Sequence, residues 1–178
     1  AMAWEPMWAD LAAQADAWDR ADLEAEVAER VVIEQSSVTW ADRVRAALGH
    51  SVSMRTRGGR QWRGVIHAYG QDFVALAAPA IGGPTQVIIA RDAVTEVAGL
   101  PRAATPQGAL APSTARRSLS AVLRRVSGEL VPVLLHRDDG SVCPGEVSAV
   151  GHDYVDLVDD RSVTLTVPLR AVVAVTPR

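Results

Sequence analysis

The sequence predicts a mainly β protein with helices, of the α+β class: an N-terminal helix followed by two tandem five-stranded barrels, each preceded by a short helix. The first observation behind this prediction is an internal repeat. Residues 52–76 align without gaps with residues 133–157, and residues 87–97 align with residues 165–175. Identical residues in the first alignment include Gly59/Gly140, Gly64/Gly145, Gly70/Gly151 and Asp72/Asp153. The chain therefore uses one unit twice.

The second observation is a period-two alternation of apolar residues inside each copy, broken by Gly or Asp-Gly, which is typical of short strands joined by tight turns. We expect strands near 51–57, 60–69, 72–78, 85–90 and 94–98, and again near 131–137, 142–150, 153–158, 162–167 and 171–176. Gly64 and Gly145 fall in mid-strand, where glycine indicates a bend. Such bends allow five short strands to curl into a small barrel.

Each copy begins with a helical pattern that stops at a glycine. Residues 39–49 end at Gly49, and residues 118–128 end at Gly128. The intervening stretch is rich in Pro and small residues, which is typical of a linker. The expected domains are an acidic helix (1–36), a first barrel with its helix (37–98), a linker (99–113) and a second barrel with its helix (114–178).

The N-terminal helix carries a seam of large apolar residues. Pro6 suits its first turn, and Trp4, Trp8, Leu11, Ala15 and Trp18 recur at spacings of four and three. Three tryptophans are too many to leave in water. The seam packs within the chain, or it mediates self-association or contact with a partner, and Trp4, Trp8, Leu11 and Trp18 are the candidate residues for such association.

Composition excludes several functional classes. A net charge of −3 and 48% hydrophobic residues indicate a soluble globular protein, which we expect in the cytoplasm. No stretch is apolar enough to span a membrane, and the single cysteine and four histidines lack metal-ligand spacing. Catalytic motifs are also missing. We therefore expect no enzyme, no cofactor, no metal, no membrane contact and no small-molecule substrate.

Charge is unevenly distributed along the chain. Residues 1–35 carry nine acids and two arginines, residues 36–128 carry four acids and twelve arginines, and residues 129–178 carry eight acids and four arginines. All 18 basic residues are arginine, which indicates the codon bias of a GC-rich, bacterial genome. The basic middle is most concentrated in the stretch "RTRGGRQWRG".

This stretch predicts a basic hairpin with an aromatic side chain, in which Arg55, Arg57, Arg60 and Arg63 surround Trp62. Arginines attract phosphate and tryptophan stacks on bases, so these five residues are candidates for binding RNA or DNA. The alternatives are a solvated strand face, or contact between arginine and an acidic protein surface. The second copy has "HRDDGSVCPG" at the same place, so only the first copy is basic.

The two copies resemble the Sm-like (LSm/Hfq) family. "AYGQDFVAL" and "AVGHDYVDL" resemble the first Sm motif, and "IIARDAV" and "VPLRAV" resemble the second, over roughly residues 37–98 and 114–176. The resemblance implies small barrels whose fourth strand pairs with the fifth strand of a neighbour. The residues that bind bases in this family are not matched, because Gly70 or Gly151, Val74 or Val155, and Ala90-Arg91 or Pro168-Leu169 occupy their places.

Two functional hypotheses follow. The first is a non-enzymatic adaptor or scaffold that acts through protein–protein association, as a homo-oligomer or with another protein. The second is an RNA- or DNA-binding protein that uses the basic hairpin of the first copy.

Overall fold

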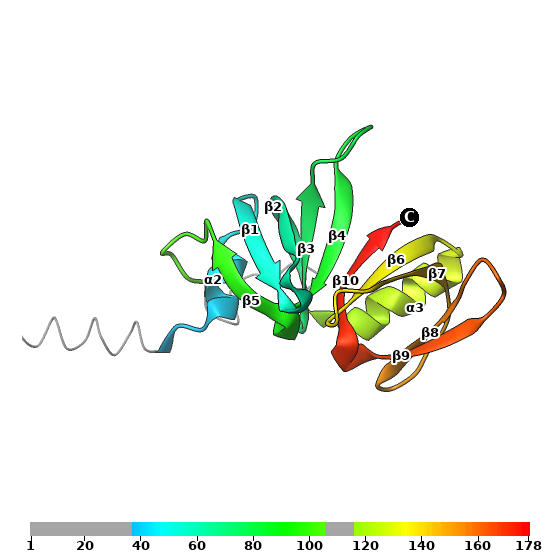
Figure 1. The fold of residues 1–178 in the computed structure, drawn as a ribbon. Helices are drawn as coiled ribbons and strands as arrows, with labels where there is room; N and C mark the ends of the chain where they lie inside the picture. Colours follow the sequence, from blue (N-terminus) through cyan, green and yellow to red (C-terminus); the bar gives the residue numbers. More distant parts are fainter. Residues whose placement is uncertain (1–36, 106–115) are drawn as a thin grey trace, which may run out of the picture. The chain divides into compact units, whose positions relative to one another are not determined.

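The structure, a computed structural model, describes residues 37–105 and 116–178. Residues Trp40–Arg178 form one compact unit, and Figure 1 shows its strands and helices. The expected N-terminal helix, with Trp4, Trp8, Leu11 and Trp18, lies outside the described residues.

The described elements follow the repeat. The first half contains α2 (Trp40–Ala46), β1 (Ser51–Thr56), η1 (Arg57–Gly59), β2 (Gln61–Tyr69), β3 (Phe73–Ala78), β4 (Thr85–Ala90), η2 (Arg91–Ala93) and β5 (Val94–Ala98). The second half contains α3 (Leu119–Glu129), β6 (Pro132–Arg137), β7 (Val142–Val150), β8 (Tyr154–Val158), β9 (Thr164–Pro168), η4 (Leu169–Ala171) and β10 (Val172–Pro177). The ten expected strands are present, with ends that differ from the expected ones by at most two residues.

The prediction of two separate five-stranded barrels is wrong. The strands form one open antiparallel sheet in the order β5-β1-β2-β3-β4-β10-β6-β7-β8-β9. The two halves are joined where β4 pairs with β10, through Ile88 opposite Val175 and Ile89 opposite Ala174. Ile89, Ala174 and Val175 are buried there, so joining the halves removes apolar strand edges from water.

Each half has the same internal strand order, and its irregularities also repeat. The register of the β2–β3 pair shifts between Ile66 and Ala68, and that of the β7–β8 pair shifts between Val147 and Ala149. These positions are equivalent in the sequence alignment. A β-bulge bends a strand and increases its twist, so both halves curve at the same place.

The mid-strand glycines allow neighbouring strands to approach each other closely. A Cβ atom on Gly64 would lie 2.5 Å from the carbonyl oxygen of Ala77, and one on Gly145 would lie 2.6 Å from that of Val158. Neither distance is tolerated between real atoms. Gly64 and Gly145 therefore allow β3 and β8 to lie against β2 and β7, which a larger residue would prevent.

The two helices end differently. Helix α2 ends at Ala46, before the expected stop at Gly49, and Gly49 in the following turn adopts a φ of +80°. Helix α3 instead continues through Gly128 and ends at Glu129, and the next residue, Leu130, adopts a left-handed φ of 51°. The expected stop at Gly128 is therefore wrong. At the other end of α3, Ser118 accepts a hydrogen bond from the Ala121 amide and caps the helix.

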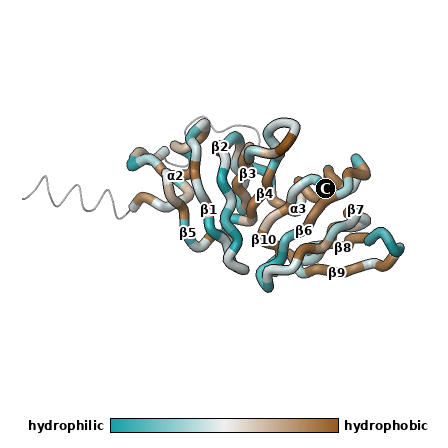
Figure 2. The backbone as a smooth tube through the Cα atoms, turned by 45° about the horizontal axis from the view of Figure 1, so that its top comes forward, coloured by the Kyte–Doolittle hydropathy of each residue, from teal (hydrophilic) through white to brown (hydrophobic). Residues whose placement is uncertain are grey.

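One core runs through both halves. In β1, and in β2 as far as Ile66, every second residue is buried. Val172–Val175 of β10 are all buried because β10 lies in the middle of the sheet. Hydrophobic residues accordingly follow β4 and β10 (Figure 2). Neither helix of the described residues has the length and apolar character needed to cross a membrane.

Candidate functional site

The arginine hairpin lies at the junction, a name used here for the contacts between the first and second halves. It consists of the end of β1, the turn η1 and the start of β2. Gly58 in this turn has a φ of +77°, and a Cβ atom there would lie 3.1 Å from the Asp138 oxygen and the Gly140 nitrogen. The turn of the first half therefore touches the equivalent turn of the second half, and glycine permits both the conformation and the contact.

The arginines of the hairpin have different surroundings. Arg55 is exposed and forms an ion pair of 3.4 Å with Glu96 on β5. Arg57 donates a hydrogen bond of 3.0 Å to the carbonyl oxygen of Arg170 in the second half. Arg63 is exposed and forms no hydrogen bond or ion pair among the described residues.

Trp62 is 7% exposed rather than displayed on the surface. Its Nε1 donates a hydrogen bond of 3.2 Å to Oγ1 of Thr56. The Arg60 guanidinium lies 4.6 Å from the indole centroid, and the ring of His136 meets the indole edge-on at 4.9 Å. These contacts hold Trp62 between the two halves by cation–π and aromatic interactions.

His136 contacts Arg60, Trp62 and Thr176. It is itself buried, with 4% of its surface exposed. Its Nδ1 lies 3.1 Å from Nη1 of Arg60 and its Nε2 lies 3.2 Å from Oγ1 of Thr176. Because Arg60 can only donate, Nδ1 is the acceptor and the ring proton sits on Nε2. Burial, assisted by the charge of Arg60, lowers the pKa of His136 from 6.5 to about 4, so the ring is neutral at pH 7.

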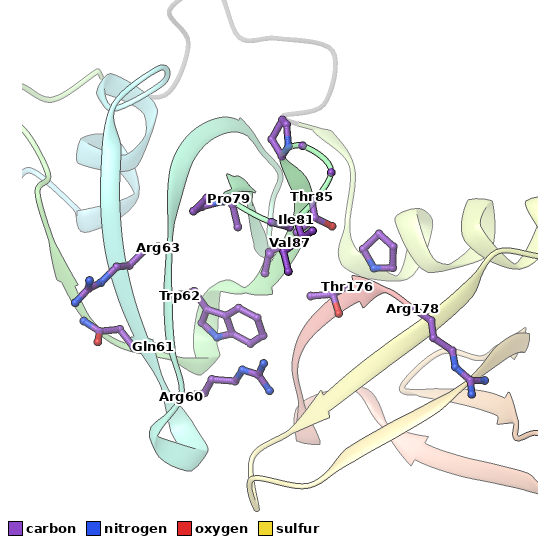
Figure 3. A pocket seen from close by; sticks show the side chains of 16 residues that line it. Arg60, Gln61, Trp62, Arg63, Pro79, Ile81, Thr85, Val87, Thr176 and Arg178 are labelled. Atoms are coloured by element: carbon purple, nitrogen blue, oxygen red, sulfur yellow. The ribbon is translucent and has the colours of Figure 1, made fainter.

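A cavity of about 780 Å³ opens beside this cluster. In Figure 3, Trp62 and Thr176 face each other across it, Arg60 lies at its base, and Ile81 and Val87 line it from the first half. Arg63 and Gln61 contribute to the lining, but their side chains point away from the cavity (Figure 3). The lining contains three arginines and no acidic residue. Both apolar and polar residues therefore line the cavity, and its charged side chains are all positive.

The sequence-based candidates are thus partly brought together. Arg60 and Trp62 form one cluster and Arg57 contacts the second half, whereas Arg55 and Arg63 lie on the outer surface. Sequence reasoning missed His136, Thr176 and the loop at residues 79–84. The available signal was weak: His136 stood in an apolar strand, and the loop combined Ile81 with two glycines and two prolines.

No group of His, Cys, Asp or Glu side chains among residues 37–105 and 116–178 is arranged to hold a metal ion. Comparison with protein-family models, curated proteins and solved structures finds no match to this chain. The resemblance to the Sm-like family therefore remains a prediction from sequence.

Proposed function

We propose that this protein is a non-enzymatic cytoplasmic adaptor that acts through protein–protein association, and that its chains associate end to end through β5 and β9. The observation behind this proposal is the order of the sheet. Among the described residues, the two edge strands are β5, the fifth strand of the first half, and β9, the fourth strand of the second half. A fourth strand already pairs with a fifth strand inside the chain, at β4–β10.

The repeat gives the register of the proposed contact. Ile88 and Ile89 align with Thr166 and Val167, and Ala174 and Val175 align with Glu96 and Val97. Because Ile88 pairs with Val175 inside the chain, Thr166 of one chain should pair with Val97 of the next. Likewise, Val167 should pair with Glu96.

The free edges carry both polar and apolar side chains. Thr95 and Glu96 are exposed on β5, while Leu165 on β9 and Val163 beside it are 36% and 50% exposed. The two residue pairs between β4 and β10 inside the chain, Ile88–Val175 and Ile89–Ala174, are both apolar. Contact between chains should therefore be weaker than the contact between halves, and it should depend on protein concentration.

Two further considerations support association. The resemblance to the Sm-like family implies pairing of a fourth strand with a neighbour's fifth strand. The seam of Trp4, Trp8, Leu11 and Trp18 supplies a second candidate surface, outside the described residues.

A cysteine cross-link tests the register directly. In a chain with Cys143→Ser, the double variant Val97→Cys/Thr166→Cys should form disulfide-linked multimers under mild oxidation, because directly opposed strand residues lie within disulfide range. The measurement is gel electrophoresis without reductant, with light scattering of the unmodified chain over a range of concentrations.

The control pairs Thr166→Cys with Thr95→Cys, which lies two residues out of register on the same strand. Equal cross-linking of both double variants would contradict the proposed register, and a monomer at every concentration would contradict association through these edges. A chain that starts at residue 37 separates the sheet edges from the N-terminal seam. If that chain no longer assembles, the seam rather than the edges is responsible.

Nucleic-acid binding is the alternative, and titration with generic RNA and DNA at low salt tests it. Binding that disappears on charge reversal of Arg55, Arg57, Arg60 and Arg63 would replace the adaptor hypothesis. The buried position of Trp62 disfavours base stacking by this residue.

A further inference from the structure

We infer that the cavity at the junction binds an extended acidic segment of a partner protein, with a carboxylate on Arg60 and an apolar side chain against Trp62. This inference rests on the adaptor function proposed above and specifies the chemistry of a second partner. It concerns a different surface from the sheet edges β5 and β9.

The strand pairing favours an extended segment. β4 and β10 pair at only two positions, after which β4 continues over Thr85–Val87 and β10 continues over Thr176 and Pro177. The two strands separate beyond their paired residues (Figure 1), and these separated segments line the cavity. On the side toward the cavity, neither segment has a paired strand. An added strand can use such an edge for main-chain hydrogen bonds.

The walls favour an apolar side chain in that segment. Trp62 and Val87 are buried residues of the lining, and Pro177 lines the cavity from β10. Ile81 at the rim is fully exposed, in a loop whose glycines Gly82 and Gly83 adopt positive φ. Ile81 is one of the residues that line the cavity, so an apolar side chain bound there would cover part of its surface.

The positive charge of the cavity lining favours an acidic residue in the bound segment. Arg60 uses one Nη1 hydrogen for His136 and is held over Trp62, while Nε and Nη2 make no hydrogen bond among the described residues. Arg178 is already neutralised by Asp160, at 2.6 Å. A fixed guanidinium with free donors binds a carboxylate with little loss of side-chain entropy. Arg60 is therefore the group that selects an acidic partner.

The residues that the first half contributes to this site have no counterpart in the second half. At the positions equivalent to Arg60 and Trp62, the second half has Ser141 and Cys143. The loop equivalent to residues 79–84 contains Asp159 and Asp160. The equivalent positions of the second half therefore lack the cation and the aromatic wall, so each chain should bind one segment.

A panel of short fluorescent peptides tests the inference on the full chain. Each peptide alternates valine and threonine and carries one glutamate two positions from a valine, so that both side chains face the same way in a strand. The matched peptides carry lysine instead of glutamate. We expect saturable fluorescence anisotropy for glutamate peptides, quenching or shifting of tryptophan emission, and at least tenfold weaker binding of lysine peptides.

Variants of the chain identify the cavity. Arg60→Glu and Ile81→Ser should each weaken binding of the glutamate peptides, by about tenfold or more for Arg60→Glu. Arg63→Glu is the matched control, because Arg63 lies close in sequence but points away from the cavity. Melting curves check folding, and Ile81 is so exposed that its replacement should leave stability unchanged.

The inference would be overturned if no glutamate peptide bound, or if the lysine peptides bound equally well. It would also be overturned if Arg60→Glu and Arg63→Glu weakened peptide binding equally while Ile81→Ser left the peptide affinity unchanged. Failure here is distinguishable from failure of the proposed assembly. Cross-linking through Val97→Cys and Thr166→Cys does not involve the cavity, so it should persist in the Arg60→Glu variant.

Discussion

Arg60 and Trp62 belong to a strand that the local sequence pattern predicts, but their contacts with the second half are not visible in that pattern. Alternation along the strand correctly places Val52, Met54 and Thr56 on the buried face of β1. It cannot reveal that His136, far along the chain, lies against Trp62. The arginine-rich stretch therefore looks like a displayed basic surface in the sequence, whereas part of it holds the two halves together.

The buried histidine predicts a pH dependence of stability. The pKa of His136 is about 4 in the folded chain and 6.5 without burial, so between these values only the unfolded chain binds the proton. His136 contributes its full stability above pH 6.5, and about 3 kcal/mol of this is lost as the pH falls to 4. Urea unfolding of the wild type and of His136→Phe between pH 7 and pH 4 measures this contribution.

Other groups also titrate in this range, so the contribution of His136 is obtained by comparing the pH dependence of the free energy of unfolding between variants. The His136→Phe chain should have a lower free energy of unfolding at pH 7 but a shallower pH dependence. His152 is exposed, and His152→Phe should keep the slope of the wild type. Identical slopes for the wild type and the His136→Phe chain would contradict a lowered pKa at this residue.

At the level of elements, the backbone conformations that follow the two helices differ in free-energy cost. Gly49 and Leu130 occupy equivalent positions and both adopt positive φ, which costs a leucine about 1–2 kcal/mol but costs glycine almost nothing. Leu130 is 71% exposed, so its side chain contributes little packing. We expect Leu130→Gly to raise the free energy of unfolding by about 1 kcal/mol, measured by chemical denaturation.

The reciprocal substitution is the control for this prediction. Gly49→Ala introduces the same strain after α2 and should destabilise the chain by about 1 kcal/mol. No Cβ contact would arise there, because nothing lies within 4 Å. A lower free energy of unfolding for Leu130→Gly than for the wild type would contradict this prediction.

The strands could be predicted from sequence far better than their arrangement. Apolar alternation and the turn glycines locate each strand to within two residues, because both signals are local. The β4–β10 pairing is not local. The sequence at Ile88 and Ile89 is equally compatible with a strand of a closed barrel and with pairing to Val175 and Ala174. The groove beside this pairing was equally unpredictable, since residues distant in sequence form its two walls.

For the whole molecule, the continuous sheet predicts that both halves unfold together. Leu76 and Leu157 are equivalent residues, each fully buried in its own half. Replacing either by alanine should cost about 2–5 kcal/mol. Because β10 belongs to the pairing of both halves, each variant should lower the midpoint of one shared transition.

Circular dichroism and tryptophan fluorescence test this cooperativity in a chain whose Trp4, Trp8, Trp18 and Trp40 are replaced by phenylalanine. Emission then comes from Trp62 in β2, while circular dichroism reports on all strands. The Leu157→Ala substitution lies in the second half, yet it should shift the Trp62 signal as well. Separate transitions for the two probes, or a Trp62 signal that ignores Leu157→Ala, would mean that the halves unfold independently.

The position of β10 also has a consequence for the order of events during synthesis. This strand leaves the ribosome after the other nine, yet it occupies the middle of the sheet between β4 and β6. Until it arrives, the apolar edge at Ile88 and Ile89 is exposed and can accept the β10 of a neighbouring nascent chain. The same strand that completes the folded monomer thus makes exchange between chains the characteristic misfolding risk of this protein.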